Sequence, residues 1–312
     1  MNVLVLGGGP DPEREVSLES SAAVAAALDA CKGMTAERRI IERPESIDDL
    51  PGEVIFPALH GAWGEGGPLQ RILVRDGRPF VGCGPDAARL CMDKLATKLI
   101  ALSQGVRTPH ALVLTPGERV PPIPAPAVVK PVHDGSSVGL AICRTQKALR
   151  EAVREPGASA FGGPRMIEAM IPGRELTCGL VDRGNGFEAL PLVEIVPADG
   201  AYDYQAKYAR DDTRYIPESE AAPGFDAPAI KRDTLRLAEV IGLRHLARAD
   251  FMIDDSGDHW LLEVNTMPGF TAHSLVPQAA AAVGIGLGEL CRTLCERAAA
   301  EHSSPGGRPA ES

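Results

Sequence analysis

The amino-acid sequence predicts a mixed α/β fold, in which an N-terminal parallel sheet is followed by α+β units with antiparallel strands. Two patterns support this prediction. In residues 3–75, short apolar runs typical of buried strands alternate with helical segments, and such alternation builds parallel sheets. Residues 247–253 and 259–264 alternate in polarity and are joined by a polar turn, which is typical of an antiparallel hairpin. The length of 312 residues allows two or three domains.

The N-terminal unit, which we place at residues 1–88, begins as strand, glycine turn and helix. The predicted strands are 3–6 and 54–58, and the predicted helices are 16–30 and 69–75. Parallel strands of this kind bind ligands at their carboxyl ends, so the turns after residues 6 and 58 are candidate binding positions.

Two further units, 89–168 and 169–302, and a tail follow. The strands expected are 111–114, 127–130, 140–143, 166–169, 175–181, 187–196, 247–253 and 259–264, and the helices are 93–104, 146–154, 226–241 and 287–301. Residues 199–220 lack periodicity, and a loop of this length is usually functional or disordered. Residues 303–312 are rich in Ser, Pro and Gly, so we expect a disordered tail.

The composition excludes several classes of function. With 32 Lys and Arg against 42 Asp and Glu, the formal net charge is −10, which is unfavourable for binding nucleic acid. The sequence lacks an apolar run of membrane-spanning length, and its N-terminus lacks the features of a signal peptide. We therefore expect a cytoplasmic protein that binds neither nucleic acid nor membrane. The seven cysteines have no disulfide or zinc spacing and are expected to be free thiols.

A candidate magnesium site lies on the C-terminal hairpin. Residues two apart on a strand face the same side, so Glu263 and Asn265 project together, and Asp250 can face them from the adjoining strand. Two carboxylates and an amide oxygen suit Mg²⁺. The alternative is a solvated strand face, although Glu263 follows an apolar run and therefore needs a partner.

A candidate phosphate site follows Lys130. The loop Gly135-Ser136-Ser137-Val138-Gly139 can offer backbone N–H groups to phosphate oxygens, and Lys130 can bind phosphate as a point charge. An ordinary hairpin turn is the alternative. The chain contains no Walker A motif, and Gly7-Gly8-Gly9 does not extend to a dinucleotide-binding G-x-G-x-x-G.

Three other segments carry candidate residues. Glu13 and Glu15 lie at the start of the first helix, where acidic residues are often only cap or dipole partners. Three of the four tyrosines fall within residues 202–208, which suggests a lid that excludes water, or alternatively a loop packed on the surface. Ser274 is a predicted N-cap, and the N–H groups after it form a candidate carboxylate site or a plain strand–helix connection.

Together these segments resemble one family over about residues 3–300, the D-alanine–D-alanine ligases. Nine motifs occur in the order seen in that family: Glu13-Arg14-Glu15-Val16-Ser17, Leu59-His60-Gly61, Met92-Asp93-Lys94, Val129-Lys130-Pro131, Gly135-Ser136-Ser137-Val138-Gly139, Tyr202-Asp203-Tyr204, Ala206-Lys207-Tyr208, Glu263-Val264-Asn265-Thr266 and His273-Ser274-Leu275-Val276-Pro277. The resemblance implies a three-domain ATP-grasp fold that binds ATP and two Mg²⁺ or Mn²⁺ ions and joins D-alanine to D-alanine through an acyl phosphate for peptidoglycan synthesis.

The resemblance also implies a role for each matching residue on the nucleotide side. Lys94, Lys130 and Lys207 would bind ATP phosphates. Glu168 would meet the adenine amino group and Ile171 the ring, while Glu175 would bind the ribose. The metal ligands would be Asp250, Glu263 and Asn265, as the residue pattern also indicates.

The implied substrate contacts are equally specific. Glu13 would bind the ammonium of the first D-alanine in a hydrogen-bond network with Ser136 and Tyr208. Arg248 and the N–H of Gly269 would stabilise the oxyanion. The substrate-binding set is completed by His60, by Ser274 and by the N–H of Leu275, the last two of which would take the carboxylate of the second D-alanine.

The departures from the family pattern leave every implied catalytic group in place. Gln205 stands where Glu is frequent, Met170 replaces an aromatic residue, and Met267 replaces a small residue next to Gly269. Two alternatives stay open, a ligase that takes D-serine or D-lactate as second substrate and a catalytically silent nucleotide-binding protein. Tyr208 disfavours D-lactate. Relatives are usually homodimers, and the helix 16–30 is a candidate interface by analogy.

Overall fold

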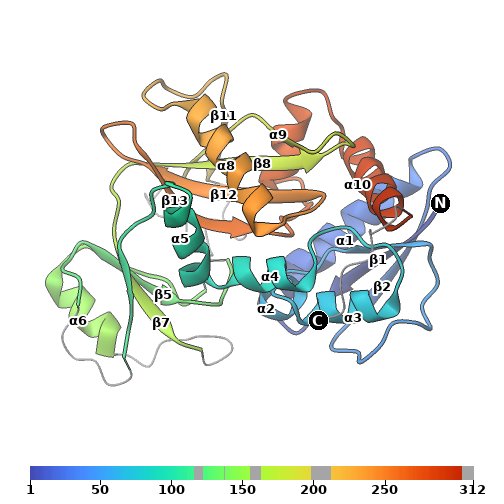
Figure 1. Cartoon of the computed structure of the whole chain (residues 1–312), viewed down its shortest axis with the longest axis horizontal. Helices are drawn as coiled ribbons and strands as arrows, with labels where there is room; N and C mark the ends of the chain where they lie inside the picture. Colours follow the sequence, from blue (N-terminus) through green and yellow to red (C-terminus); the bar gives the residue numbers. More distant parts are fainter. Residues whose placement is uncertain (116–121, 137, 155–162, 198–211, 304–312) are drawn as a thin grey trace.

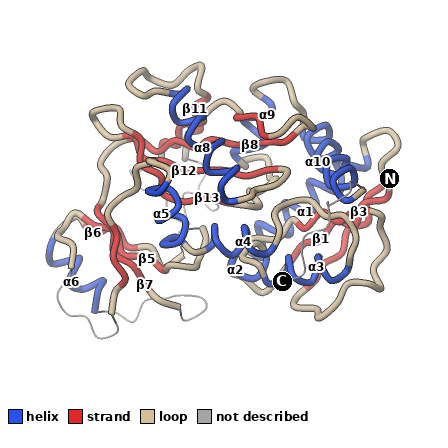
Figure 2. The backbone as a smooth tube through the Cα atoms, in the orientation of Figure 1, coloured by secondary structure: helices blue, strands red, loops and turns tan. Residues whose placement is uncertain are grey.

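The computed structural model describes residues 1–115, 122–136, 138–154, 163–197 and 212–303. In this part of the chain the strands form three sheets (Figure 1), one of three, one of four and one of six strands. The four-stranded sheet and its helix lie at one end of the long axis, and the N-terminal sheet lies at the other (Figure 2). The expected mixture of parallel and antiparallel sheets is confirmed. The domain boundaries at residues 88 and 168 stay a prediction.

The N-terminal sheet is parallel, with strand order β2-β1-β3, and is followed by short helices. Its elements are β1 (Asn2–Gly8), α1 (Arg14–Asp29), β2 (Thr35–Ile41), β3 (Val54–Pro57), α2 (Gly61–Gly64) and α3 (Pro68–Asp76). β1 is apolar and central, so both of its faces are buried. Strand β2 was not predicted, because it lies at the sheet edge with largely polar, exposed side chains.

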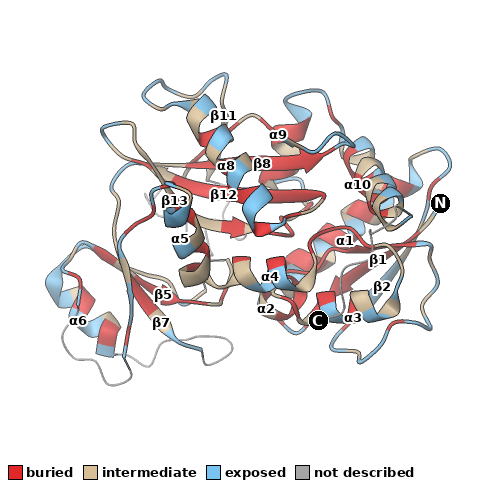
Figure 3. Cartoon of the chain, in the orientation of Figure 1, coloured by how far each residue is buried: buried red, intermediate tan, exposed pale blue. Residues whose placement is uncertain are grey.

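The four-stranded sheet is antiparallel, with strand order β4-β7-β5-β6. Its elements are β4 (Ala111–Val113), β5 (Ala127–Pro131), β6 (Ala141–Cys143), α6 (Gln146–Arg154) and β7 (Arg165–Ala169). Leu149 and Val153 of α6 pack into a small core against the sheet, while the outer face of α6 is exposed (Figure 3). The register places Glu168 of β7 beside Val128 of β5. Because Lys130 follows two residues later on the same side of β5, Lys130 and Glu168 can meet.

The six-stranded sheet runs in the order β11-β10-β8-β12-β13, with β9 paired to β8. Its elements are β8 (Arg174–Asp182), β9 (Phe187–Ala189), β10 (Val193–Val196), β11 (Arg214–Pro217), α8 (Ala227–Ile241), β12 (Leu246–Ile253), β13 (His259–Asn265) and α9 (Leu275–Ala281). Two predictions were wrong here. The single strand expected at 187–196 is two strands, because Pro191 cannot donate a ladder hydrogen bond. The loop expected at 199–220 contains β11, which pairs with β10.

Two helices connect the sheets. α4 (Pro85–Met92) and α5 (Lys94–Ser103) meet at Asp93, whose carboxylate accepts the N–H groups of Leu95 and Ala96 at 3.0 Å and so caps α5. This cap fixes where α5 begins, and therefore where Lys94 and Lys98 project. α5 packs against β13 and α8, which brings both lysines to the edge of the hairpin.

The C-terminal helix α10 (Leu287–His302) ties the first unit to the last. It packs against α1, and Leu294 belongs to the same core as Val24 and Phe270. Phe56 of the N-terminal sheet meets the ring of Phe270 edge to face at 5.1 Å between ring centroids. The N-terminal unit and the six-stranded sheet therefore share one core.

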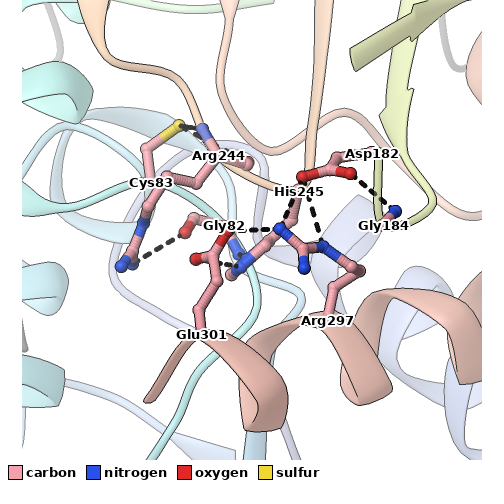
Figure 4. A network of polar contacts seen from close by, with 8 residues as sticks. All are labelled: Gly82, Cys83, Asp182, Gly184, Arg244, His245, Arg297 and Glu301. Atoms are coloured by element: carbon pink, nitrogen blue, oxygen red, sulfur yellow. Dashed lines mark hydrogen bonds and ion pairs between the residues drawn. The ribbon is translucent and has the colours of Figure 1, made fainter. Parts of the chain in front are cut away.

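A polar network reinforces this junction (Figure 4). The buried His245 accepts the N–H of Gly82 at Nδ1 (2.9 Å), so its proton lies on Nε2 and is donated to Glu301 (2.9 Å). Arg297 donates to both Glu301 and Asp182 at 2.8 Å. Burial lowers the pKa of His245, although the carboxylate of Glu301 opposes that shift.

All seven cysteines are free, as expected. Six are buried, and Cys31 is half-buried. In the described residues, no helix is both long and apolar enough to cross a membrane. The predicted tail, 303–312, lies outside the described residues except for Ser303.

Candidate active site

The hairpin β12–β13 places the predicted metal ligands side by side. Its register pairs Asp250 with Glu263 and Arg248 with Asn265, and a bulge follows Asp250. The pairing confirms that Asp250 faces the other two candidate ligands across the strands. Because β-bulges re-aim side chains next to functional sites, this irregularity fits a specialised position rather than a solvated strand face.

Asp250 is almost fully buried and is neutralised by the chain itself. Arg248 donates to both of its carboxylate oxygens, from Nε and from Nη2, each at 2.8 Å. Thr177 of β8 donates its hydroxyl to Asp250 Oδ1 at 2.7 Å. The residue expected to stabilise an oxyanion thus lies beside the residue expected to bind metal.

The donor set of this hairpin fits magnesium. Asp250, Glu263 and Asn265 present two carboxylates and an amide oxygen, which are hard ligands of the kind that Mg²⁺ prefers. Both carboxylates are met by cations of the chain, Asp250 by Arg248 and Glu263 by Lys94. Within the described ranges no group of three His, Cys, Asp or Glu side chains could hold a metal, so this candidate set depends on Asn265.

A cavity between the four-stranded sheet and the hairpin gathers the residues expected to bind ATP. Its walls include Lys94, Lys130, Glu168, Ile171, Glu175, Asp250 and Glu263. Apolar side chains such as Val128, Leu140, Met170 and Leu262 form much of the remaining wall. A cavity with apolar walls and a cationic end suits a flat base attached to phosphates.

Glu168 is the buried anion of this cavity. Its Oε1 lies 2.5 Å from Nζ of Lys130, and its Oε2 lies 2.9 Å from Nζ of Lys98. Burial by itself would raise the pKa of Glu168, but the charges of Lys130 and Lys98 outweigh it and hold that pKa below its usual range. Glu168 is therefore ionised, and it can act only as an acceptor.

A second cavity gathers the residues expected to bind the amino-acid substrates. Its walls include His60, Glu65, Lys94, Ser136, Arg248, Glu263, Asn265, Gly269, Ser274 and Leu275. Lys94 and Glu263 line both cavities, and their ion pair measures 3.4 Å between Nζ and Oε2. The two cavities are therefore neighbours that share these side chains.

Glu13 is buried beside the second cavity. The hydroxyl of Ser136 hydrogen-bonds to its carboxylate, and the backbone of Gly61 and Gly135 lies so close that a Cβ on either would meet it at 2.9 and 2.8 Å. Burial raises the pKa of Glu13, and the nearby charge of Asp11 adds to the shift. The structure thus brings Glu13 and Ser136 together, as the resemblance implied.

His60 joins the N-terminal unit to the loop after β13. Its Nδ1 donates to the carbonyl of Met267 (3.0 Å), and its Nε2 accepts from the hydroxyl of Ser20 (3.3 Å), which in turn accepts the N–H of Phe270 (3.1 Å). Burial lowers the pKa of His60 to about 4, so the ring is neutral near pH 7. In this structure His60 holds the loop that carries Gly269.

Glu65 belongs to the site but was not predicted. Its carboxylate accepts the N–H of Met267 at 3.1 Å and the N–H of Gly61 at 3.2 Å. Burial raises the pKa of Glu65 to about 8, and the charge of Glu13 adds to the shift. A Glu four residues after Gly61 looks like a helix-surface residue in the sequence, because its partner Met267 is 202 residues away.

The turn before α9 differs from expectation in one contact. Ser274 occupies the N-cap position, but its hydroxyl makes no capping hydrogen bond to α9 and instead accepts the N–H of Thr271 at 2.9 Å. An added Cβ on Gly269 would lie 2.7 Å from Ser274 Oγ, so the close approach of these residues requires glycine. Gly269, Ser274 and Leu275 line the cavity together, as expected.

Comparison with known proteins decides the family. Residues 119–296 match the family model described as "D-ala D-ala ligase C-terminus", which is more than half of the chain. The chain belongs to the D-alanine–D-alanine ligase family.

Curated members of the ligase family match nearly the whole chain. A protein named D-alanine--D-alanine ligase from Bordetella petrii is 38% identical over 310 residues, covering 96% of this chain and 93% of its own length. One from Cupriavidus necator is 40% identical over 292 residues, covering 90% and 86%. The alignments therefore extend over nearly the whole chain.

Solved structures show the same fold, which is the expected ATP-grasp fold. The D-alanine-D-alanine ligase from Coxiella burnetii superposes with a TM-score of 0.81 at 23% identity, over 97% of this chain and 94% of that one. The VanG D-Ala:D-Ser ligase from Enterococcus faecalis superposes with a TM-score of 0.78 at 23% identity, over 95% and 99%. Of the residues implied by the ligase family, Lys207 and Tyr208 lie outside the described residues, as does the rest of the predicted lid at 202–208.

Proposed function

We propose that the protein joins two D-alanines into D-alanyl-D-alanine at the expense of ATP, for peptidoglycan precursor synthesis. The observation that carries this proposal is the pair of neighbouring cavities that share Lys94 and Glu263. One cavity has walls suited to a nucleotide, and the other lies against Glu13, Ser136 and Arg248. Phosphoryl transfer from a nucleotide to a substrate carboxylate needs such adjacency.

The first step forms an acyl phosphate. A carboxylate oxygen of the first D-alanine attacks the γ-phosphorus of ATP, and ADP leaves. Lys94 and Lys130 bind the phosphates and offset their charge, and Glu168, Ile171 and Glu175 hold the nucleoside.

The candidate metal set acts on the same phosphates. Mg²⁺ or Mn²⁺, two ions by analogy with the family, would be held by Asp250, Glu263 and Asn265 and would neutralise charge that develops on the transferred group. The donor chemistry supports this assignment, because two carboxylates and an amide oxygen lie side by side on the hairpin; Asp250 also pairs with Arg248, and Glu263 with Lys94.

The second step forms the peptide bond. The amine of the second D-alanine attacks the activated carbonyl, loses a proton and displaces phosphate. Arg248 and the N–H of Gly269 stabilise the oxyanion. Glu13, with Ser136 and Tyr208, binds the first ammonium group. Ser274 and the N–H of Leu275 take the second carboxylate.

Other parts of the proposal rest on the family alone. We assign Lys207 to the γ-phosphate and expect residues 202–208 to close over the acyl phosphate, because water would hydrolyse it. The domains are placed at 1–88, 89–168 and 169–302. The protein is proposed to act as a homodimer in the cytoplasm, where ATP is available, and sedimentation of the purified chain tests the dimer.

The decisive experiment is phosphate release from ATP and Mg²⁺ with D-alanine, with L-alanine and without an amino acid. Release that requires D-alanine, with the dipeptide detected by mass, supports the proposal. Absence of D-alanine-dependent release refutes it. Offering D-serine or D-lactate beside D-alanine at neutral pH identifies the second substrate, and a dominant mixed product would overturn the choice of D-alanine.

A further inference from the structure

Lys98 is a buried lysine behind the nucleotide cavity, one helical turn after Lys94 on α5. Its side chain is 5% exposed. Nζ lies 2.9 Å from Glu168 Oε2, and it donates to Thr108 Oγ1 at 2.7 Å and to the carbonyl of Pro109 at 3.2 Å. The ammonium of Lys98 therefore donates two hydrogen bonds besides its ion pair with Glu168, and these contacts hold it in place.

The carboxylate of Glu168 is divided between two lysines of different exposure to the cavity. Lys130 lines the cavity and contacts Oε1, whereas Lys98 is not part of the wall and contacts Oε2 from behind. Lys130 is the lysine expected to bind phosphate. When it turns to a phosphate, Lys98 is the cation that stays with Glu168.

This arrangement answers an electrostatic problem. A buried carboxylate that loses its only cation becomes protonated or turns toward water, because an unpaired buried charge is costly. A protonated Glu168 would donate a hydrogen bond and would suit a 6-oxo purine. An ionised Glu168 only accepts, and it suits the 6-amino group of adenine.

We propose that Lys98 is the positioning residue that keeps the Glu168 carboxylate a pure acceptor facing the cavity, and thereby sets the preference for a 6-amino over a 6-oxo purine. This inference rests on the proposed function, since it takes the cavity to be the nucleotide site. Lys98 acts through Glu168, and it touches neither the reacting groups nor the phosphates.

A purely structural role for Lys98 makes a different prediction. Thr108 donates its hydroxyl to the carbonyl of Leu261 at 2.8 Å, so Lys98 also stabilises the connection between α5 and β13. Loss of that connection would lower the stability of the protein and would weaken the binding of all nucleotides alike. Only the positioning role predicts that loss of Lys98 changes the ratio of the dissociation constants for 6-amino and 6-oxo purine nucleotides.

The experiment measures binding of ADP and of inosine diphosphate by calorimetry, with Mg²⁺ and without D-alanine. Inosine carries a 6-oxo group in place of the 6-amino group. The wild type is expected to prefer ADP by about 10- to 100-fold, the value of a hydrogen bond to a charged group. Lys98→Met should reduce the ratio of the two dissociation constants by about tenfold or more, whereas Lys98→Arg, which keeps the charge, should retain most of it.

Two further variants keep the test decisive. Thr108→Val removes the structural bridge but leaves the Lys98–Glu168 pair, so it should keep the wild-type ratio. Lys98→Gln keeps an N–H donor for Thr108 and Pro109 while removing the charge, and it carries the same prediction if the methionine variant does not fold. In steady state, the neutral variants should raise KM for ATP and leave KM for D-alanine unchanged.

The possible outcomes distinguish failure of the role proposed for Lys98 from failure of the proposed ligase activity. A wild-type ratio in folded Lys98→Met or Lys98→Gln overturns the role of Lys98, and so does a wild type that binds both nucleotides equally well. If the neutral Lys98 variants lose the preference for ADP but the wild type releases no phosphate with D-alanine, the ligase proposal is refuted and the role of Lys98 is supported.

Discussion

Lys94 and Glu263 form an ion pair of 3.4 Å between Nζ and Oε2, at the place where the nucleotide cavity meets the substrate cavity. Lys94 is the first residue of α5, and Glu263 lies on β13. This one contact therefore depends both on where α5 begins and on the register of the hairpin. A phosphoryl group that passes between the cavities must pass these two charges.

Glu263→Gln should raise the Mg²⁺ concentration needed for half-maximal activity by about 10- to 100-fold, because a charged metal ligand is replaced by a neutral one. The measurement is phosphate release over a Mg²⁺ series. Glu188→Gln, an exposed carboxylate paired with Arg183, is the matched control and should leave the Mg²⁺ dependence unchanged. If the Mg²⁺ dependence of Glu263→Gln coincides with that of the wild type, Glu263 is not a metal ligand.

Arg248→Ala should lower kcat by about 10²–10³, the usual loss for one oxyanion donor. It also strips Asp250 of its cation, so calorimetric unfolding without metal is needed beside the kinetics. A stable variant with unchanged kcat would show that Arg248 serves Asp250 and not the oxyanion. The kcat of Arg248→Lys, which keeps the charge but cannot make the bidentate contact, should lie between those of the wild type and of Arg248→Ala.

The His60 prediction concerns stability against pH. Burial depresses the pKa of His60 to about 4 in the folded state, against 6.5 for the free side chain. Between these values the unfolded chain binds more protons, so the stability that neutral His60 contributes is full above pH 6.5 and is lost as the pH falls toward 4. The shift corresponds to about 3 kcal/mol.

Urea unfolding at several pH values between 7 and 4 measures this effect. The free energy of unfolding of His60→Gln should fall less over the window than that of the wild type. The exposed His110→Gln is the control and should follow the wild-type curve. Parallel curves for all three proteins would mean that His60 does not titrate as its burial predicts.

Arg297→Ala should lower the free energy of unfolding by about 1–3 kcal/mol, because it removes charged hydrogen bonds to the buried carboxylate of Asp182 and to the partly exposed carboxylate of Glu301. Thermal and urea unfolding measure the loss, and kcat at 25 °C should be unchanged. Arg292→Ala, an exposed arginine on the same helix, should be nearly neutral. Equal free energies of unfolding for the two variants would show that the network does not stabilise the junction.

The sequence predicted the parts of the fold that local pattern determines. β12 and β13 were recognisable because their side chains alternate, whereas the pairing of Asp250 with Glu263 depends on the bulge after Asp250, which the sequence did not predict. β2 was not predicted from the sequence, because edge strands need little apolar surface. The strand expected at 187–196 was drawn across Pro191, although proline interrupts a ladder.

The unpredicted site residues owe their positions to distant partners. Glu65 contacts Met267, and Lys98 contacts Glu168 across two secondary-structure elements. No local pattern distinguishes a lysine that pairs with a buried carboxylate from one that faces solvent. Lys94 was identified only because it lies within a family motif.

The distribution of thiols gives the chain built-in reporters of local opening. The four-stranded sheet has Cys143, the six-stranded sheet has Cys178, and α10 has Cys291, each buried with a raised pKa. A thiol reagent reacts with the exposed thiolate, so each modification must wait until its own region opens. The order in which these cysteines are labelled, read by peptide mass, would therefore rank the regions of an unmodified chain by how often they open.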